Sequence, residues 1–462
     1  MDDERVTHAT EHPDLRRAIG PWLLFFFVLG DIVGAGIYAL VGEVGAVVGG
    51  AIWAAFLFSF ILAIFTAGSY AELVTKYPRA GGAATYVNNA FRIPFLSFMV
   101  AFAVMAAGIT SACTLTLAFS GDYLSQFVGI PSLIAAVVFM IALGLINFYG
   151  ISESVKINVI LTCVEITGLL LIILIGAVTV GAGQADPGRA FEFKEGASVL
   201  TALFGGTVLA FYALIGFDDS VNVAEETRHP SRNYPRAIFG GLLAAGVIYL
   251  LVTILASMVV PTGQLAGSSG PLLEVVERGT LTVPTKLFAA IALLAVSNGA
   301  LINLIMASRI TYGMADQGVL PTVFSTVHQG RRTPWVAILF VTTIGLIMIL
   351  SLGADALDTL SSTTVVLLLL AFIMVNSSVL ALRGDRVEHE HFRTPTVFPV
   401  LGIVVSLALL IYSAVDDITI FVLAGLLLLL GVVLYGVDLL AKSRLDRESP
   451  EASVDEPPET RS

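Results

Sequence analysis

The sequence predicts an all-α, polytopic membrane protein. Hydrophobic residues make up 56% of its 462 residues and charged residues only 13%, whereas soluble domains carry about 25% charged residues. The mean hydropathy is +0.90. Long apolar runs recur along the chain, and each has the roughly 20 residues that a helix needs to cross a bilayer. A single membrane domain is therefore expected, rather than a series of soluble domains.

Twelve membrane-spanning helices are expected within a membrane domain at residues 21–441. A polar, acidic tail at residues 1–20 precedes them, and it has neither the apolar core nor the cleavage site of a signal peptide. A second acidic tail, expected to be disordered, follows at residues 442–462. The expected spans are 21–48, 50–75, 95–120, 131–149, 157–181, 198–225, 236–260, 285–314, 333–352, 357–382, 396–414 and 417–441.

The positive charges predict how the chain is oriented in the membrane. All but four of the 24 Lys and Arg residues fall in segments that share one side of the membrane with the N-terminus. Since such segments are normally cytoplasmic, both termini are expected in the cytoplasm and the protein in the plasma membrane. Basic residues in these loops are expected to contact lipid phosphates. The four exceptions are Arg189, Lys194, Arg278 and Lys286.

Several classes of function are excluded or disfavoured. A net charge of −11 argues against nucleic-acid binding, which needs a basic face. The histidines lie in tails and loops without metal-ligand spacing, so neither a metal nor a cofactor is expected. Cys113 and Cys163 lie in apolar runs and are expected to be small packing residues. The run from Gly34 to Ala39 fits a dinucleotide-binding pattern, but that pattern requires a preceding strand. No catalytic constellation is present, so an enzyme is not expected.

The first expected span is interrupted near its middle. Gly30, Gly34 and Gly36 weaken the helix there, since each glycine costs about 1 kcal/mol relative to alanine. Asp31 places a carboxyl group in the same stretch, where charge is expensive and usually functional. A broken membrane helix is tolerated where its freed backbone groups line a cavity. The alternative is close helix packing, because Gly30 and Gly34 also fit the G-x-x-x-G pattern.

The sixth span carries a similar interruption, at Gly216 followed by Asp218 and Asp219. The two interruptions lie five spans apart, and an odd number of spans places the second unit upside down in the membrane. Paired interruptions in inverted units indicate a transporter's binding site at the membrane midplane. The repeat is inferred from topology alone, with units at 21–181 and 198–382 and two further spans at 396–441.

Five motifs together resemble the amino acid–polyamine–organocation superfamily, and most closely the prokaryotic permeases similar to cationic amino acid transporters. They cover residues 34–38, 77–82, 216–218, 225–237 and 309–321. The resemblance implies a leucine-transporter-type fold with a 5+5 inverted repeat and discontinuous helices 1 and 6. It also implies amino-acid transport, usually by proton symport or by exchange.

The resemblance further implies a binding site for an amino-acid head group, built from backbone atoms. The second half of the first span would present free N–H groups and a positive dipole end to the substrate carboxylate. The first half of the sixth span would present carbonyl groups to the ammonium. Residue by residue, the resemblance places the carboxylate on the amides of Gly34, Ala35 and Gly36, and the ammonium on the carbonyls of Ile32, Tyr212, Ala213 and Ile215.

Two carboxyl groups are the candidates for ion coupling. Some proton-coupled relatives carry a lysine in the fifth span, and alignment places Glu165 at that position. Asp31 lies about three residues before the interruption in the first span, which neighbours the fifth in this fold. Either carboxyl group could carry a proton, since burial and like charge favour the neutral form of one of them. Alternatively, the two could ligate Na⁺ or simply hydrogen-bond to a neighbouring helix.

A secondary amino-acid transporter working by alternating access is therefore the main hypothesis, with an amino-acid substrate and H⁺ or Na⁺ as coupling ion. An amino-acid sensor or binding scaffold on the same fold is the alternative. A channel would need a filter or pore-lining rings, and none is apparent in the sequence. Whether the substrate is neutral or cationic stays open.

Overall fold

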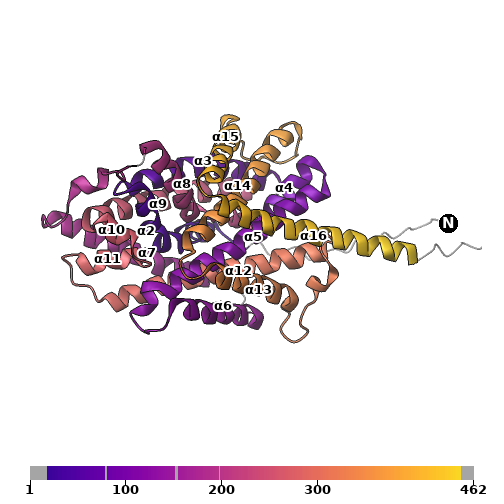
Figure 1. Cartoon of the computed structure of the whole chain (residues 1–462). Coiled ribbons are helices and arrows are strands. Elements are labelled where there is room, and N and C mark those ends of the chain that lie inside the picture. The colour runs from indigo at the N-terminus through magenta and orange to yellow at the C-terminus, as the bar shows by residue number, and fades with distance from the viewer. Residues whose placement is uncertain (1–17, 79–80, 151–154, 197, 449–462) are drawn as a thin grey trace, which may run out of the picture.

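The computed structural model describes residues 18–78, 81–150, 155–196 and 198–448. Within these ranges the chain forms a bundle of helices, and twelve segments are long and apolar enough to cross a membrane (Figure 1). Extended pairing in the described ranges is limited to isolated bridges, such as that between Ile19 and Thr227. The predicted all-α, twelve-span architecture is confirmed.

The spans have the following bounds. They are α1 Pro21–Val33 with α2 Gly36–Val48, α3 Ile52–Lys76, α5 Pro94–Ala118 with η1 Phe119–Tyr123, α6 Ser132–Tyr149, α7 Val155–Gly181, α8 Val199–Leu214 with η3 Asp219–Glu226, α9 Pro230–Val259, α12 Thr285–Asp316, α13 Trp335–Leu352, α14 Leu357–Ala381, α15 Val397–Asp416 and α16 Ile418–Glu448. Shorter helices connect them: α4 Gly82–Phe91, η2 Pro187–Phe191, α10 Thr262–Ala266, α11 Pro271–Arg278, η4 Thr322–Ser325 and η5 Leu382–Gly384.

The first and sixth spans each contain a break, and the two breaks lie against each other. A Cβ atom on Gly36 would come within 2.7 Å of Ala213 Cα. Gly216 has φ +123°, and a Cβ there would lie 2.5 Å from the carbonyl oxygen of Asp31. Both glycines are therefore required by close backbone approach, and Gly216 also by its left-handed conformation. No such contact fixes Gly34, since its added Cβ would meet only carbonyls of its own helix at 3.5 Å.

The packing interpretation of the glycine pattern holds for Gly30. A Cβ at this position would lie 1.9 Å from Thr162 Oγ1 on α7, so α1 and α7 pack closely here. Packing of this kind does not account for the helix break at Gly34 and Ala35.

Four expectations from the sequence differ from the structure. The segment after α3, expected to be a loop, contains α4. Two further short helices, α10 and α11, lie between the seventh and eighth spans, and α9 begins at Pro230, six residues before the expected start at 236. Proline is well suited to the first helical position. The last helix continues past Ala441 to Glu448 and extends beyond the rest of the bundle (Figure 1), so residues 442–448 are helical.

The hairpin of α10 and α11 packs against α2. Gly42 allows this approach, because a Cβ there would lie 2.4 Å from the carbonyl oxygen of Leu265. Asp122 at the end of the third span fastens the hairpin, with its Oδ2 accepting hydrogen bonds from Ser268 Oγ at 2.9 Å and from the Ser269 amide at 2.8 Å. These contacts hold the hairpin against α2 and the end of the third span.

A buried polar network joins the end of α3 to the segment after α14. Glu72, with a side chain only 4% exposed, pairs with Arg383 at 3.3 Å. Its Oε2 also accepts a hydrogen bond from the Thr394 amide at 2.8 Å. Lys76 Nζ donates to the carbonyls of Leu382 and Asp385 at 2.6 and 2.7 Å. The network therefore ties α3, α14 and the start of α15 together.

Replacing Arg383 with methionine should lower the melting temperature by roughly 5 °C, because breaking a buried ion pair leaves an uncompensated charge. Differential scanning fluorimetry of the purified protein measures this shift. Arg386→Met is the matched control, since Arg386 lies in the same segment but is exposed. Equal melting temperatures for the two variants would show that the ion pair does not stabilise the fold.

Candidate functional site

A cavity of about 90 Å³ lies between the two helix breaks. That is room for several water molecules, since one water needs roughly 10–15 Å³ of such volume. Its walls come from the breaks themselves and from α5, α12 and α14. The residues proposed from the sequence to contact a substrate all lie in these walls: Ile32, Gly34, Ala35, Gly36, Tyr212, Ala213 and Ile215.

The start of α2 presents backbone amides to the cavity. This helix begins at Gly36, and no side chain caps it. The first amides of a helix have no acceptor within the helix, and they carry the positive end of its dipole. Together with the break at Gly34 and Ala35, they form a place where an anionic group can bind without a basic side chain.

The end of α8 presents carbonyl groups, but three of the four carbonyls proposed to bind the ammonium already accept a hydrogen bond from the protein. Tyr249 on α9 approaches the carbonyl of Ile32 at 2.6 Å and that of Ala213 at 3.1 Å through its hydroxyl. The Tyr212 carbonyl accepts from the Ile215 amide at 3.3 Å. Sequence reasoning missed Tyr249, whose contact with the breaks depends on how α9 packs.

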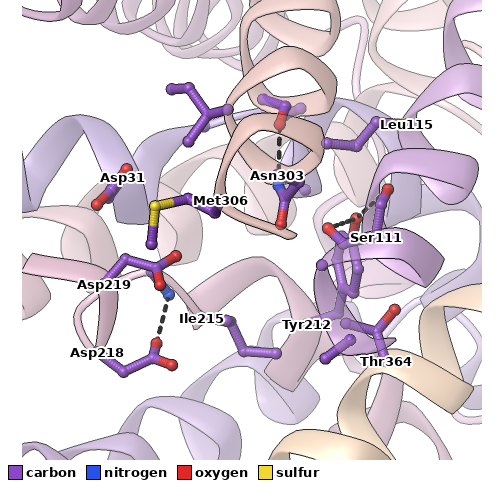
Figure 2. A pocket seen from close by; sticks show the side chains of 18 of the residues that line it. Asp31, Ser111, Leu115, Tyr212, Ile215, Asp218, Asp219, Asn303, Met306 and Thr364 are labelled. Atoms are coloured by element: carbon purple, nitrogen blue, oxygen red, sulfur yellow. Dashed lines mark hydrogen bonds between the residues drawn. The ribbon is translucent and has the colours of Figure 1, made fainter. Parts of the chain in front are cut away.

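Three carboxyl groups lie on one side of the cavity. Asp31, Asp218 and Asp219 all line it, and Figure 2 shows them together, opposite Tyr212. The Asp218 carboxylate accepts a hydrogen bond from the Gly216 amide at 3.2 Å. Asp218 thereby stabilises the turn at the second break. No Lys or Arg is among the described residues that line the cavity, so this side favours a positively charged group.

The opposite side carries hydroxyl groups. Ser111 Oγ and the Tyr212 hydroxyl are 2.9 Å apart, and Thr364 Oγ1 lies 2.7 Å from Thr110 Oγ1. Figure 2 shows Ser111, Tyr212 and Thr364 gathered there. Sequence reasoning missed the side chains of α5 and α14, although polar residues inside apolar spans are a recognisable signal of function.

Glu165 lies outside the cavity wall. Its side chain is buried, and its Oε1 accepts a hydrogen bond from Asn298 Nδ2 at 3.1 Å. Asn298 itself lines the cavity. Glu165 Oε2 has no hydrogen-bond partner among the described residues. The Glu165 backbone carbonyl also accepts from the Tyr38 hydroxyl of α2 at 2.6 Å. Asn298 therefore connects this carboxyl group to the cavity.

Among the described residues, no group of three or more His, Cys, Asp or Glu side chains is placed to hold a metal ion. The two cysteines are free, with Cys113 buried and Cys163 exposed. The expectation that Cys163 packs in the interior is therefore wrong, because its face of α7 points outward from the bundle.

Comparison with known proteins identifies the family. The family model described as "Amino acid permease" matches residues 19–434, which is nearly the whole chain. The chain belongs to the amino acid permease family. Members of this family are transporters, so the permease is not an enzyme.

Named relatives of the permease match over most of its length. It is 25% identical to the branched-chain amino acid permease BcaP of Bacillus subtilis (strain 168), over 94% of this chain and 95% of that protein. It is 29% identical to the low-affinity putrescine importer PlaP of Escherichia coli (strain K12), over 81% of this chain and 83% of that protein. The cationic amino acid transporter 9, chloroplastic, of Arabidopsis thaliana is 27% identical, over 70% of this chain and 60% of that protein.

Proposed function

We propose that the permease is a secondary active amino-acid transporter that works by alternating access. The observation that carries this proposal is the pair of helix breaks facing one cavity. One break offers the amide end of α2 and the other offers the carbonyl end of α8. An α-amino acid carries a carboxylate and an ammonium group on one carbon, so its head group matches both ends at once.

The head group would be held by backbone atoms, as follows. The carboxylate would accept hydrogen bonds from the amides of Gly34, Ala35 and Gly36, supported by the dipole of α2. The ammonium would lie at the carbonyl end, with the carboxylates of Asp31, Asp218 and Asp219 on the same side of the cavity adding attraction. These contacts select for an amino group and leave the side chain of the substrate to α5, α12 and α14.

The names of the three relatives described above support an amino-bearing substrate without selecting its side chain. They refer to branched-chain amino acids, cationic amino acids and putrescine. An amino group is common to all three. The proposed substrate is accordingly an amino acid, either neutral or cationic.

Ion coupling is proposed to involve Glu165 and Asp31. A buried carboxylate is costly unless a proton, a cation or hydrogen-bond donors neutralise it. One oxygen of Glu165 has a single donor, Asn298, and the other has none among the described residues. A proton or Na⁺ arriving there would be stabilised, and Asn298 would transmit its arrival to the cavity. Asp31 lies in the cavity wall itself.

The proposed orientation places both termini in the cytoplasm of a plasma-membrane protein. Ile19 before α1 pairs with Glu226 and Arg228 at the end of the sixth span, by backbone hydrogen bonds of 3.0 Å each. These segments therefore share one side of the bundle, where the positive-inside rule places the cytoplasm. The α10–α11 hairpin would then lie on the outer side.

Counterflow in proteoliposomes tests the transport function. Liposomes loaded with an unlabelled amino acid should take up the labelled form with saturable kinetics, and uptake should be faster than into empty liposomes. Saturable binding without flux would favour an amino-acid sensor on the same fold. Flux without acceleration by internal substrate would indicate a channel. Either result would contradict the proposal.

A further inference from the structure

Tyr249 connects the two helix breaks without lining the cavity. Its side chain is 1% exposed, and its hydroxyl lies 2.6 Å from the Ile32 carbonyl oxygen and 3.1 Å from that of Ala213. Ile32 belongs to the last turn of α1 and Ala213 to the last turn of α8. One hydroxyl group therefore bonds to both interrupted spans at the point where each stops being helical.

This contact offsets an unfavourable electrostatic interaction between the carbonyl ends of the two breaks. Each break leaves carbonyl oxygens without a helical donor, and the negative ends of two helix dipoles meet here. The Tyr249 proton is shared between the two oxygens, since a hydroxyl has one proton to donate. Without it, two buried carbonyls would face each other with no donor between them, which is unfavourable.

The ring of Tyr249 is itself held in place. It packs edge-on against Phe56 of α3, with ring centroids 5.7 Å apart. The helix that carries it packs against α1, α3 and α7. The position of the hydroxyl is thus set by helices outside the two breaks.

We propose that Tyr249 is a positioning residue that fixes the spacing between the amide end of α2 and the carbonyl end of α8. This inference rests on the proposed function, because the spacing matters for a ligand that spans both ends. It also reassigns the ammonium contact. The carbonyls of Ile32 and Ala213 accept from Tyr249, and that of Tyr212 accepts from the Ile215 amide. This leaves the Ile215 carbonyl at the cavity wall as the principal backbone acceptor for the substrate.

Tyr249→Phe is the direct test, because phenylalanine keeps the ring and removes only the hydroxyl. Binding of amino acids should weaken about tenfold, which corresponds to about 1.4 kcal/mol. The factor should be the same for small and large substrate side chains, since only the head-group contacts change. Tyr234→Phe is the matched control. Tyr234 is also buried on α9 and donates to a backbone carbonyl, that of Ser220 at 2.9 Å, but it does not join the breaks.

Two measurements separate positioning from a general structural role. In Tyr249→Phe, isothermal titration should show a tenfold loss of affinity for an amino acid. The loss should be less than twofold for the corresponding primary amine, which lacks the carboxylate and contacts only the carbonyl end of α8. Hydrogen exchange on the ligand-free protein should be about tenfold faster at residues 32–36 and 213–216 in Tyr249→Phe, and unchanged there in Tyr234→Phe.

Each result has a definite meaning. Unchanged exchange at the breaks would overturn the connecting role of Tyr249. Faster exchange with unchanged amino-acid affinity, or with equal losses for amino acid and amine, would overturn the positioning role. A wild-type protein that binds no amino acid would refute the proposed function and the positioning role with it, while the exchange data would still decide whether Tyr249 holds the breaks together.

Discussion

Gly216→Ala should reduce amino-acid binding at least 100-fold, or about 2.7 kcal/mol. Gly216 adopts φ +123°, which residues with a Cβ rarely do, and the added Cβ would lie 2.5 Å from the Asp31 carbonyl oxygen. The backbone at one break would have to move away from the other, and the amide and carbonyl ends would separate. Titration with labelled amino acids measures the loss.

The matched control for this variant is Gly313→Ala. Gly313 lies in α12, where an added Cβ would have no atom within 4 Å, so binding should be unchanged. Gly36→Ala provides an independent test, because its Cβ would collide with Ala213 Cα at 2.7 Å. Size-exclusion chromatography establishes that each variant is folded. Wild-type affinity in a folded Gly216 variant would show that the breaks do not form the binding site.

Glu165→Gln should strongly reduce accumulation driven by an ion gradient while leaving exchange in place. Glutamine keeps the size of the side chain and a carbonyl oxygen for Asn298, but it can neither release a proton nor neutralise a cation. Accumulation in proteoliposomes under an imposed proton or sodium gradient should fall roughly tenfold, or about 1.4 kcal/mol. Counterflow without a gradient should stay within twofold of the wild type.

Two further variants make the coupling test decisive. Asp438→Asn removes a carboxyl group from α16, where it pairs with Lys442 at 2.7 Å, and gradient-driven uptake should be unaffected. Asp31→Asn tests the second proposed carboxyl group. Normal accumulation in both the Glu165 and Asp31 variants would refute coupling through these residues. The gradient whose effect is lost identifies the coupling ion.

Much of the fold could be predicted because membrane spans have a strong compositional signal. Long apolar runs and the charged segments between them located nearly every span. The short helices α4, α10 and α11 could not be predicted in this way. They span 10, 5 and 8 residues, and helices this short are stable through tertiary packing rather than their own sequence.

The backbone of the candidate site was accessible to sequence reasoning, whereas its side chains were largely not. Glycines beside a carboxylate inside an apolar run mark a broken helix, so the stretches around Gly34 and Gly216 could be located. Tyr249 and Ser111 gain their roles from helices distant in sequence, which composition alone does not place together. Asn298 was detectable as a polar residue in an apolar span, but its bond to Glu165 required the structure.

The construction of the site from main-chain groups has a consequence for how this protein can diverge. A missense mutation exchanges a side chain and leaves the peptide group in place. On the proposed function, few mutations can therefore remove the groups that recognise an amino-acid head. The exceptions are Gly36 and Gly216, where any side chain would collide, and Tyr249, which joins the two breaks. The residues of α5, α12 and α14 remain free to vary, so selection could change the preferred substrate repeatedly without first losing the ability to bind one.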